Sequence, residues 1–317
     1  MKVFFLCRNE ANYTCQVRYF WRQAFERLPD VDVLCWGEGY LGWDPTRPLD
    51  EVALSRWGQF PDAFMEWDDA PQYGHPNKVP GLEMFSGPKV YQMDTYWTGP
   101  HVRWDYCNRN GFTDVVSPYL QPVEEQQPHF QAKMHWIPYG ANPALFQDRV
   151  PWKVRSWEVG LLGARGEFYP ARSAAHDFLS GQKDFSYFYR PHPGYSRGGV
   201  FNPTSIHGEE YARALSDIQV FITCGNKHHV PHAKYFEAMA AGCCLLATEP
   251  YPPGFLPPEC YARLEEPVDP GRLLGTLRHL IKDGAGEAMA QRGRAWVQSC
   301  GLLEHRAQAL REILCGG

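Results

Sequence analysis

The order of predicted elements between residues 218 and 248 constrains the fold more than any other feature of the sequence. Ile218 to Thr223 is a continuous apolar run rich in β-branched residues, which is typical of a parallel strand covered on both faces. Ala233 to Ala241 contains strong helix formers, and Gly242 follows in the position of a C-terminal glycine cap. Cys243 to Thr248 is a second apolar run. The sequence therefore predicts an α/β protein built from parallel strands and covering helices.

The loop of residues 224–232 is the first candidate ligand site. It follows the carboxyl end of a predicted strand and precedes a helix N-terminus, which is where open α/β sheets bind their ligands. Glu237 lies one turn inside that helix and is the only acidic residue between Ile218 and Ala247. A solvated helix carboxylate is one interpretation, but the flanking residues are apolar or small and favour a carboxylate in a crevice. Its two acceptor oxygens suit a pair of adjacent hydroxyl groups.

Length and composition exclude several classes of protein. The chain has 317 residues, which suits two domains, and its net charge of -5 argues against a general polyanion binder. Its 10 cysteines are scattered, without C-x-x-C spacing, and no carboxylate or cysteine cluster accompanies the three histidines of the 224–232 loop, so no metal is expected. No apolar run approaches roughly 18 residues, and the first residues predict a strand rather than a signal peptide. A reduced, cytoplasmic setting is expected.

The first half of the chain also opens with a strand, a helix and a strand. Lys2 to Cys7 and Val31 to Trp36 are apolar strands, and apolar residues recur at helical spacing from Gln16 to Leu28. The turn of residues 8–12 contains no glycine, so it lacks the dinucleotide-binding fingerprint and argues against a nicotinamide enzyme. Residues 37–87 are rich in Trp, Pro, Gly and Asp and predict loops around one incomplete βα unit.

The same patterns predict the remaining elements. Further strands are expected at Ala63–Trp67, Lys89–Met93, Thr113–Ser117, Lys133–Ile137, Trp157–Leu162 and Asp184–Tyr189. Helices are expected after the glycine turn at residue 163 and at 270–281, 287–298 and 302–314.

Two segments resemble one family of enzymes. KYFEAMAAGCCLLAT (residues 234–248) is similar to the "fEamAaG.pvla" segment of GT-B glycosyltransferases, particularly their group-1 (GT4-like) and CgeB-like branches. IPYGANPALF (residues 137–146) resembles the "iPnGvd...F" element that ends the first domain in these proteins, with Tyr139 in place of the usual Asn. The resemblance implies a GT-B fold, in which two Rossmann-like domains with parallel sheets face each other across a cleft. Residues 1–150 would form the acceptor-side domain, 151–300 the nucleotide-sugar-binding domain, and 301–317 a helix packing back on the first.

The resemblance also implies a donor site in the second domain. The family's glutamate binds the ribose hydroxyls of a nucleotide-sugar, and Glu237 matches it. Gly163 and Arg165 fit the outline of the family's phosphate turn, where glycine lets backbone donors approach an anion. Arg172 fits it as well, or is a helix-surface or interdomain residue. Either Lys234 or Lys227 could neutralise the negative charge of the diphosphate. The other residues expected around the donor are Tyr235 for the nucleotide, and Asn226, Lys227 and His229 for the sugar.

The acceptor side is predicted from two residues that follow the strand at Lys89–Met93. Asp94 and His101 lie beyond its carboxyl end, where the CgeB-like branch has a similar "iDt.....H" segment. The resemblance implies that both act at the reacting carbon, although each is equally consistent with a structural loop residue. Tyr211 is expected either against the nucleobase or in the core.

One departure from the family pattern stands out. Typical GT4 enzymes carry an E-x7-E motif, but the position of its first acid is occupied by His229. The expected activity is glycosyl transfer from a nucleotide-diphosphate sugar to an unknown acceptor, with retention of configuration and without a metal or cofactor. The acceptor could be a glycan, a small molecule or a protein, and the negative net charge disfavours a nucleic acid. Two alternatives remain open: a nucleotide-sugar epimerase on the same fold, and a non-catalytic binding protein derived from a transferase.

Overall fold

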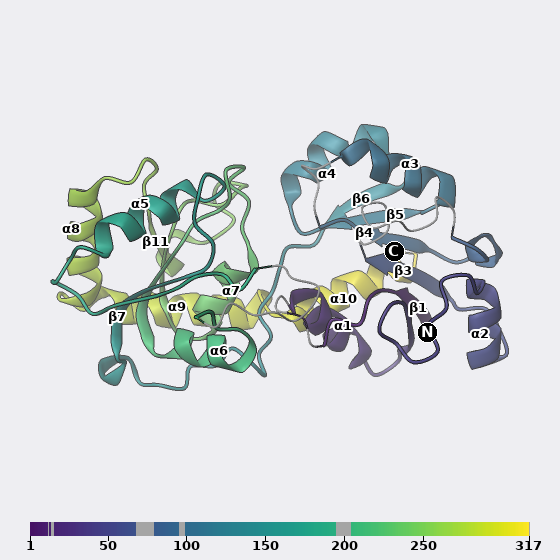
Figure 1. Cartoon of the computed structure of the whole chain (residues 1–317), viewed down its shortest axis with the longest axis horizontal. Helices are drawn as coiled ribbons and strands as arrows, with labels where there is room; N and C mark the ends of the chain where they lie inside the picture. Colours follow the sequence, from purple (N-terminus) through teal and green to yellow (C-terminus); the bar gives the residue numbers. More distant parts are fainter. Residues whose placement is uncertain (12, 14–15, 68–78, 95–98, 195–203, 317) are drawn as a thin grey trace. The chain divides into compact units, whose positions relative to one another are not determined.

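The computed structural model describes residues 1–11, 13, 16–67, 79–94, 99–194 and 204–316. The chain forms two compact units. The first comprises residues 1–12, 18–138 and 306–317, and the second comprises residues 13–17 and 139–305. Each unit contains one parallel sheet with helices (Figure 1). The predicted α/β class with two parallel sheets is therefore confirmed.

In the described part of the first unit, the sheet has 6 strands in the order β2-β1-β3-β4-β5-β6, all of them parallel. The strands are β1 (Lys2–Leu6), β2 (Asp32–Trp36), β3 (Ala63–Trp67), β4 (Lys89–Gln92), β5 (Asp114–Ser117) and β6 (Lys133–Trp136). The helices are α1 (Val17–Glu26), α2 (Leu49–Trp57), α3 (Pro100–Asn110), α4 (Leu120–Gln126) and most of α10 (Leu303–Leu314).

In the described part of the second unit, 5 parallel strands lie in the order β11-β10-β9-β7-β8. They are β7 (Trp157–Leu162), β8 (Tyr187–Arg190), β9 (Ile218–Thr223), β10 (Cys244–Ala247) and β11 (Tyr261–Arg263). The helices are α5 (Pro170–Leu179), α6 (Gly208–Ser216), α7 (Ala233–Ala240), α8 (Pro270–Ile281) and α9 (Ala285–Cys300).

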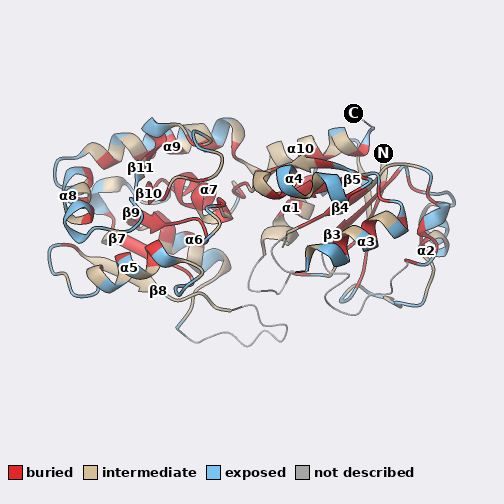
Figure 2. Cartoon of the chain, turned by 90° about the horizontal axis from the view of Figure 1, so that it is seen from above, coloured by how far each residue is buried: buried red, intermediate tan, exposed pale blue. Residues whose placement is uncertain are grey.

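The central strands of the second sheet are covered on both faces. Phe221 of β9 lies in a buried cluster with α6 and α7, whereas Val220 and Ile222 lie in another with α5 and α8. Figure 2 shows the same pattern, with buried residues concentrated along the strands. Coverage of both faces explains why the sequence of β9 is continuously apolar rather than alternating.

Some elements differ from the sequence-based expectation. Residues 37–87 include α2, which was not predicted, because only Leu49, Val52 and Ala53 of its residues are buried and the apolar pattern is weak. Helix α3 was missed because its buried residues include the polar Arg103 and Asn110. Strand β8 begins at Tyr187, three residues later than expected from Asp184. No helix of the described residues has both the length and the apolar character needed to cross a membrane.

A buried arginine ties together the elements of the second unit. Arg155 is 7% exposed, and its Nη1 atom donates to the backbone carbonyls of Ile218 at 2.7 Å and Gly242 at 2.8 Å. Its Nη2 atom pairs with Asp148 at 2.7 Å, and its Nε atom donates to the carbonyl of Val150 at 3.0 Å. The planar guanidinium thus joins the start of β9 to the turn that precedes β10.

Replacing Arg155 by alanine is therefore expected to destabilise the second unit by about 2–4 kcal/mol, because buried carbonyls and Asp148 lose their partner. Hydrogen exchange of peptides from β9 and β10 measures this loss. The exposed Arg213 is the matched control, and its change to alanine should alter stability by less than about 0.5 kcal/mol. Equal protection of β9 in wild type and Arg155→Ala would contradict the assigned role.

Candidate functional site

Polar residues of the second unit gather at the carboxyl ends of β7 and β9, which are neighbours in the sheet. The loop after β7 and the loop after β9 are joined by a hydrogen bond from the backbone N–H of Lys227 to the carbonyl of Phe168 at 2.9 Å. Helices α5 and α7 begin from these two loops. Their N-termini are therefore brought to the same edge of the sheet, where an anion is favoured.

Arg172 of α5 lies at the centre of this edge. It is 2% exposed, and its guanidinium donates to the carbonyls of Ala164 and Cys224, each at 3.2 Å. The same group lies over the ring of Tyr169, 4.0 Å from the ring centroid. Its Nε atom is buried and has no hydrogen-bond partner among the described residues. Arg172 thus has a fixed orientation and an N–H group that remains available for an acceptor.

Gly163 brings backbone close to two cations. It has a φ of +143°, which favours glycine, and an added Cβ would lie 3.0 Å from Nη1 of Arg172 and 3.1 Å from Cε of Lys234. A side chain at this position would therefore fill the space beside both cations. Gly163, Arg172 and Lys234 together form what we call the cationic cradle.

Glu237 lies beside this cradle and is connected to it through Tyr211. The Tyr211 hydroxyl donates to Oε2 of Glu237 at 3.0 Å and accepts from Nζ of Lys234 at 3.3 Å. Burial raises the pKa of the Glu237 carboxyl, and Lys234 and the Tyr211 hydrogen bond oppose this shift. Burial and the Glu237 carboxylate hold the pKa of Tyr211 well above its usual range. The phenol therefore keeps its proton at neutral pH and orients the carboxylate.

Two histidines near the cradle are held neutral. Burial, together with Arg172 and Lys234, lowers the pKa of His232 to about 3 and that of His192 to about 4. Both shifts have the sign expected where positive charge is concentrated and water is partly excluded. At pH 7 these two histidines therefore add no positive charge beside Arg172 and Lys234.

The structure brings Gly163, Lys234 and Glu237 together, as predicted from the sequence, but not the other two residues predicted for the nucleotide. Arg165 is directed elsewhere: its Nε atom donates to the Tyr189 hydroxyl at 2.9 Å, and its side chain is 36% exposed. Tyr235 lies in the core with 0% exposure, and its hydroxyl donates to the carbonyl of Thr248 at 3.0 Å.

The three residues predicted for the donor sugar lie in the loop after β9 but differ in exposure. Asn226 is 2% exposed; its Oδ1 atom accepts from the N–H of His228 at 2.8 Å, and its Nδ2 atom has no hydrogen-bond partner among the described residues. Lys227 is exposed. His229 is also exposed, has a φ of +56°, and its Nδ1 atom lies 3.8 Å from a carboxylate oxygen of Glu266. Of the three, only Asn226 presents a buried polar group.

The predicted catalytic residues lie in the first unit. Asp94 follows β4 and is half-buried, and His101 lies in the first turn of α3 and is exposed. Residues 95–98, which connect the two, lie outside the described residues. Both positions agree with the expected carboxyl edge of the sheet, and their chemical roles remain predictions.

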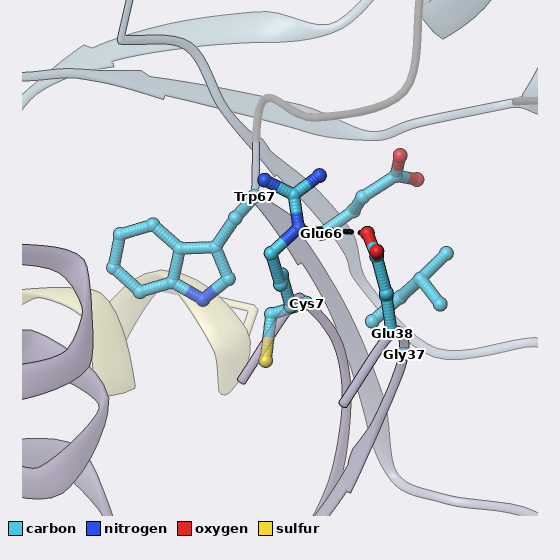
Figure 3. Close-up of a pocket in the computed structure, with 7 residues that line it drawn as sticks. Cys7, Gly37, Glu38, Glu66 and Trp67 are labelled. Atoms are coloured by element: carbon cyan, nitrogen blue, oxygen red, sulfur yellow. Dashed lines mark hydrogen bonds and ion pairs between the residues drawn. The ribbon is translucent and has the colours of Figure 1, made fainter. Parts of the chain in front are cut away.

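A pocket in the first unit was not predicted. It is a small hollow with a volume of about 20 Å³, is open to solvent, and lies where β1, β2 and β3 end (Figure 3). Arg8 pairs with Glu38 at 3.0 Å across it, and the buried Glu66 accepts from the Tyr106 hydroxyl at 2.9 Å. Trp67 also lines this pocket (Figure 3). The one feature of the sequence that could have indicated this pocket is Glu66, the single acid in the apolar strand AFMEW.

Sequence reasoning left the roles of Arg172 and Tyr211 open, and it did not single out His192. Arg172 belongs to a helix, so its burial depends on how α5 packs against β9, which no local pattern specifies. Tyr211 is 26 residues from Glu237 in the sequence. The contact between them forms only when α6 and α7 lie side by side.

Comparison with models of known protein families gives one match. Residues 172–312 match a family model described as glycosyl transferase-like. Comparison with curated protein sequences found no match.

Several solved structures are similar over nearly the whole chain. A glycosyltransferase from Rickettsia africae has a TM-score of 0.66 at 11% identity, with 99% of this chain and 97% of that chain covered. HepE from Anabaena, solved in complex with UDP and glucose, has a TM-score of 0.65 at 12% identity, with 100% of both chains covered. An alpha-glucosyltransferase in complex with UDP-glucose and DNA containing an abasic site has a TM-score of 0.67 at 10% identity, with 99% of both covered. At these identities the likeness concerns the fold. The chain thus has the GT-B fold of glycosyltransferases, and its residues 172–312 are similar to the glycosyl transferase-like family.

Proposed function

We propose that this protein transfers a sugar from a nucleotide-diphosphate sugar to an acceptor. The observation that carries this proposal is the continuous arrangement of the cationic cradle, Tyr211 and Glu237 at one edge of the second sheet. It offers cations to a diphosphate and a carboxylate to a ribose. Similar structures with bound UDP or UDP-glucose support the same class of donor.

The ribose would be held by Glu237. Its carboxylate has two oxygens, and hydroxyl groups on adjacent carbons can donate to both. The hydrogen bond from Tyr211 fixes the carboxylate before the nucleotide arrives, so less ordering is required on binding. Because burial disfavours the charged form of Glu237, hydrogen bonds from a ligand would also replace lost hydration.

The diphosphate would be held by the cationic cradle. As the bond from the anomeric carbon to the diphosphate breaks, negative charge develops on the leaving oxygen. Arg172 and Lys234 are fixed before the reaction, so they can stabilise this charge without reorganisation. The buried Nε of Arg172 supplies a donor that has no hydrogen-bond partner in the part of the protein that the structure describes.

The reacting sugar would contact the amide of Asn226, which has a buried donor free of protein partners among the described residues. Asp94 and His101 are proposed to act at the reacting carbon on the acceptor side. We retain the expectation of a retaining reaction, with an acceptor that is a glycan, a small molecule, a protein or, less favoured by the net charge of -5, a nucleic acid.

Glu237→Gln is expected to weaken UDP binding about 10-fold or more, because hydrogen bonds to a charged acceptor contribute about 1.5–3 kcal/mol. Isothermal titration calorimetry measures the change. Glu210→Gln is the matched control, since Glu210 is an exposed acid on α6 and should bind UDP as the wild type does. Unchanged affinity in Glu237→Gln would place the ribose elsewhere.

Arg172→Lys is expected to weaken UDP about 10-fold while leaving uridine binding nearly unchanged, because only the diphosphate uses the guanidinium. The control is Arg165→Lys, which alters an exposed arginine that donates to Tyr189. Calorimetric titrations with both ligands give the ratio of affinities. A larger loss of UDP affinity in Arg165→Lys than in Arg172→Lys would reverse the assignment of the diphosphate site.

Release of UDP from UDP-glucose is expected to continue in the presence of EDTA, because Arg172 and Lys234 supply the positive charge that a metal would otherwise provide. A coupled assay for UDP measures the rate with EDTA and with added Mg²⁺. Loss of more than about 90% of the rate in EDTA would show that the two cations are insufficient. Recovery of an epimerised sugar instead of a transferred or hydrolysed one would indicate the epimerase alternative.

A further inference from the structure

Three loops of the second unit meet at the edge of the sheet that carries the proposed donor site. Strands β9, β10 and β11 are neighbouring and parallel, so the loops that follow them leave from the same edge. The N–H of Tyr251, after β10, donates to the carbonyl of His229, after β9, at 2.9 Å. Oε2 of Glu266, after β11, lies 3.8 Å from Nδ1 of the same His229. An imidazole and a carboxylate from two different loops therefore stand together at this edge.

A short series of contacts joins His229 to the cationic cradle. Arg172 donates to the carbonyl of Cys224, directly after β9, at 3.2 Å. The backbone then turns back so tightly that a Cβ added to Gly225 would lie 2.9 Å from Cα of His229. Burial raises the pKa of the Cys224 thiol, Arg172 lowers it, and the Glu266 carboxylate raises it. The contacts and the charges both place the His229–Glu266 pair in the same site as the cradle.

Two other acids of these loops are held by a different cation. Arg263, the last residue of β11, pairs with Glu249 at 3.0 Å and with Glu265 at 3.7 Å. Glu266, the neighbour of Glu265, pairs with His229 instead. The side chains of Glu266 and His229 are 29% and 60% exposed, so a ligand can reach both. Of these three acids, Glu266 is the one directed toward the loop after β9.

The separation of the two side chains suits a bridging hydroxyl group. A gap of 3.8 Å is too long for a direct hydrogen bond. An alcohol oxygen about 2.8 Å from each atom can donate its proton to the carboxylate and accept from an N–H at Nδ1. On the basis of the donor site proposed above, we propose that His229 and Glu266 together bind a ring hydroxyl of the donor sugar. The carboxylate is then supplied by the loop after β11, whereas the E-x7-E pattern would place it at position 229.

The charge of Glu266 indicates that the donor sugar is neutral. A carboxylate accepts hydrogen bonds from hydroxyl groups, whereas a sugar acid would bring a second negative charge beside it. Asn226 lies in the same loop as His229, and its buried Nδ2 atom has no hydrogen-bond partner among the described residues. A hexose with free hydroxyl groups offers both a donor for Glu266 and an acceptor for this amide.

The test is calorimetric titration of the full chain with UDP, UDP-glucose and its C4 epimer UDP-galactose. In Glu266→Gln, affinity for the hexose donor that binds better should fall about 3- to 10-fold, because a partly exposed charged acceptor is lost. Affinity for UDP should stay unchanged, since UDP carries no hexose, and this result also shows that the variant is folded. Glu265→Gln alters the adjacent exposed acid and should bind all three ligands as the wild type does.

The outcomes separate this role from the donor site itself. If Glu266→Gln binds the hexose donors as tightly as the wild type, or if Glu265→Gln loses as much affinity, the pair is only a surface ion pair and the proposal is overturned. If UDP itself does not bind to the wild type, the donor site is wrong, and the role of Glu266 falls with it.

His229→Asn tests whether the two side chains share one hydroxyl group. Asparagine adopts a left-handed conformation more readily than most residues, so it suits the φ of +56° at this position. The loss of hexose-donor affinity in the double variant with Glu266→Gln should be smaller than the product of the two single losses, because either change breaks the same bridge. Fully multiplicative losses would contradict a shared hydroxyl.

UDP-glucuronic acid tests the expected class of sugar. It carries a carboxylate on the hexose and should bind to the wild type more weakly than UDP-glucose, with a smaller difference in Glu266→Gln. Tighter binding of UDP-glucuronic acid than of UDP-glucose to the wild type would overturn the assignment of a neutral sugar.

Discussion

The guanidinium of Arg172 joins the two loops on which the candidate donor site depends. One of its bonds reaches the loop after β7 and another reaches the end of β9, so the edges of two neighbouring strands are held by one planar group. Stacking on Tyr169 fixes the plane of that group. Among the described residues, this buried cation has its hydrogen bonds and ring contact with carbonyl dipoles and an aromatic face, which compensate its charge poorly. Its environment therefore favours an anion, and structural support and anion binding depend on the same side chain.

The distribution of charge along this edge follows from burial. Burial, together with the cations beside them, holds His192 and His232 neutral, whereas Tyr211 keeps its proton next to Glu237. Each group thus has a defined protonation state at neutral pH. The result is a gradient from positive at the cationic cradle to negative at Glu237, over only two hydrogen bonds. A molecule with a diphosphate at one end and a diol at the other matches that gradient in both sign and order.

Much of this arrangement was predictable from the sequence. The apolar runs of β7 and β9 and the glycine after α7 were recognised because strand burial and helix termination leave local patterns, and Gly242 indeed has a φ of +77°. The roles of Arg165 and Arg172 were not separable, because both lie near the same glycine turn and only tertiary packing decides which one is buried. The weakly amphipathic α2 gave no periodic signal, since only Leu49, Val52 and Ala53 of its residues are buried.

His229 has a left-handed backbone conformation and occupies the position where the E-x7-E pattern has its first acid. Its side chain lies beside Glu266 at the surface, and the backbone N–H of Tyr251 is bonded to its carbonyl. A glutamate introduced there would meet a like charge and would keep a backbone angle that non-glycine residues adopt at a cost. An acid at position 229 would therefore meet less repulsion if residue 266 were changed at the same time.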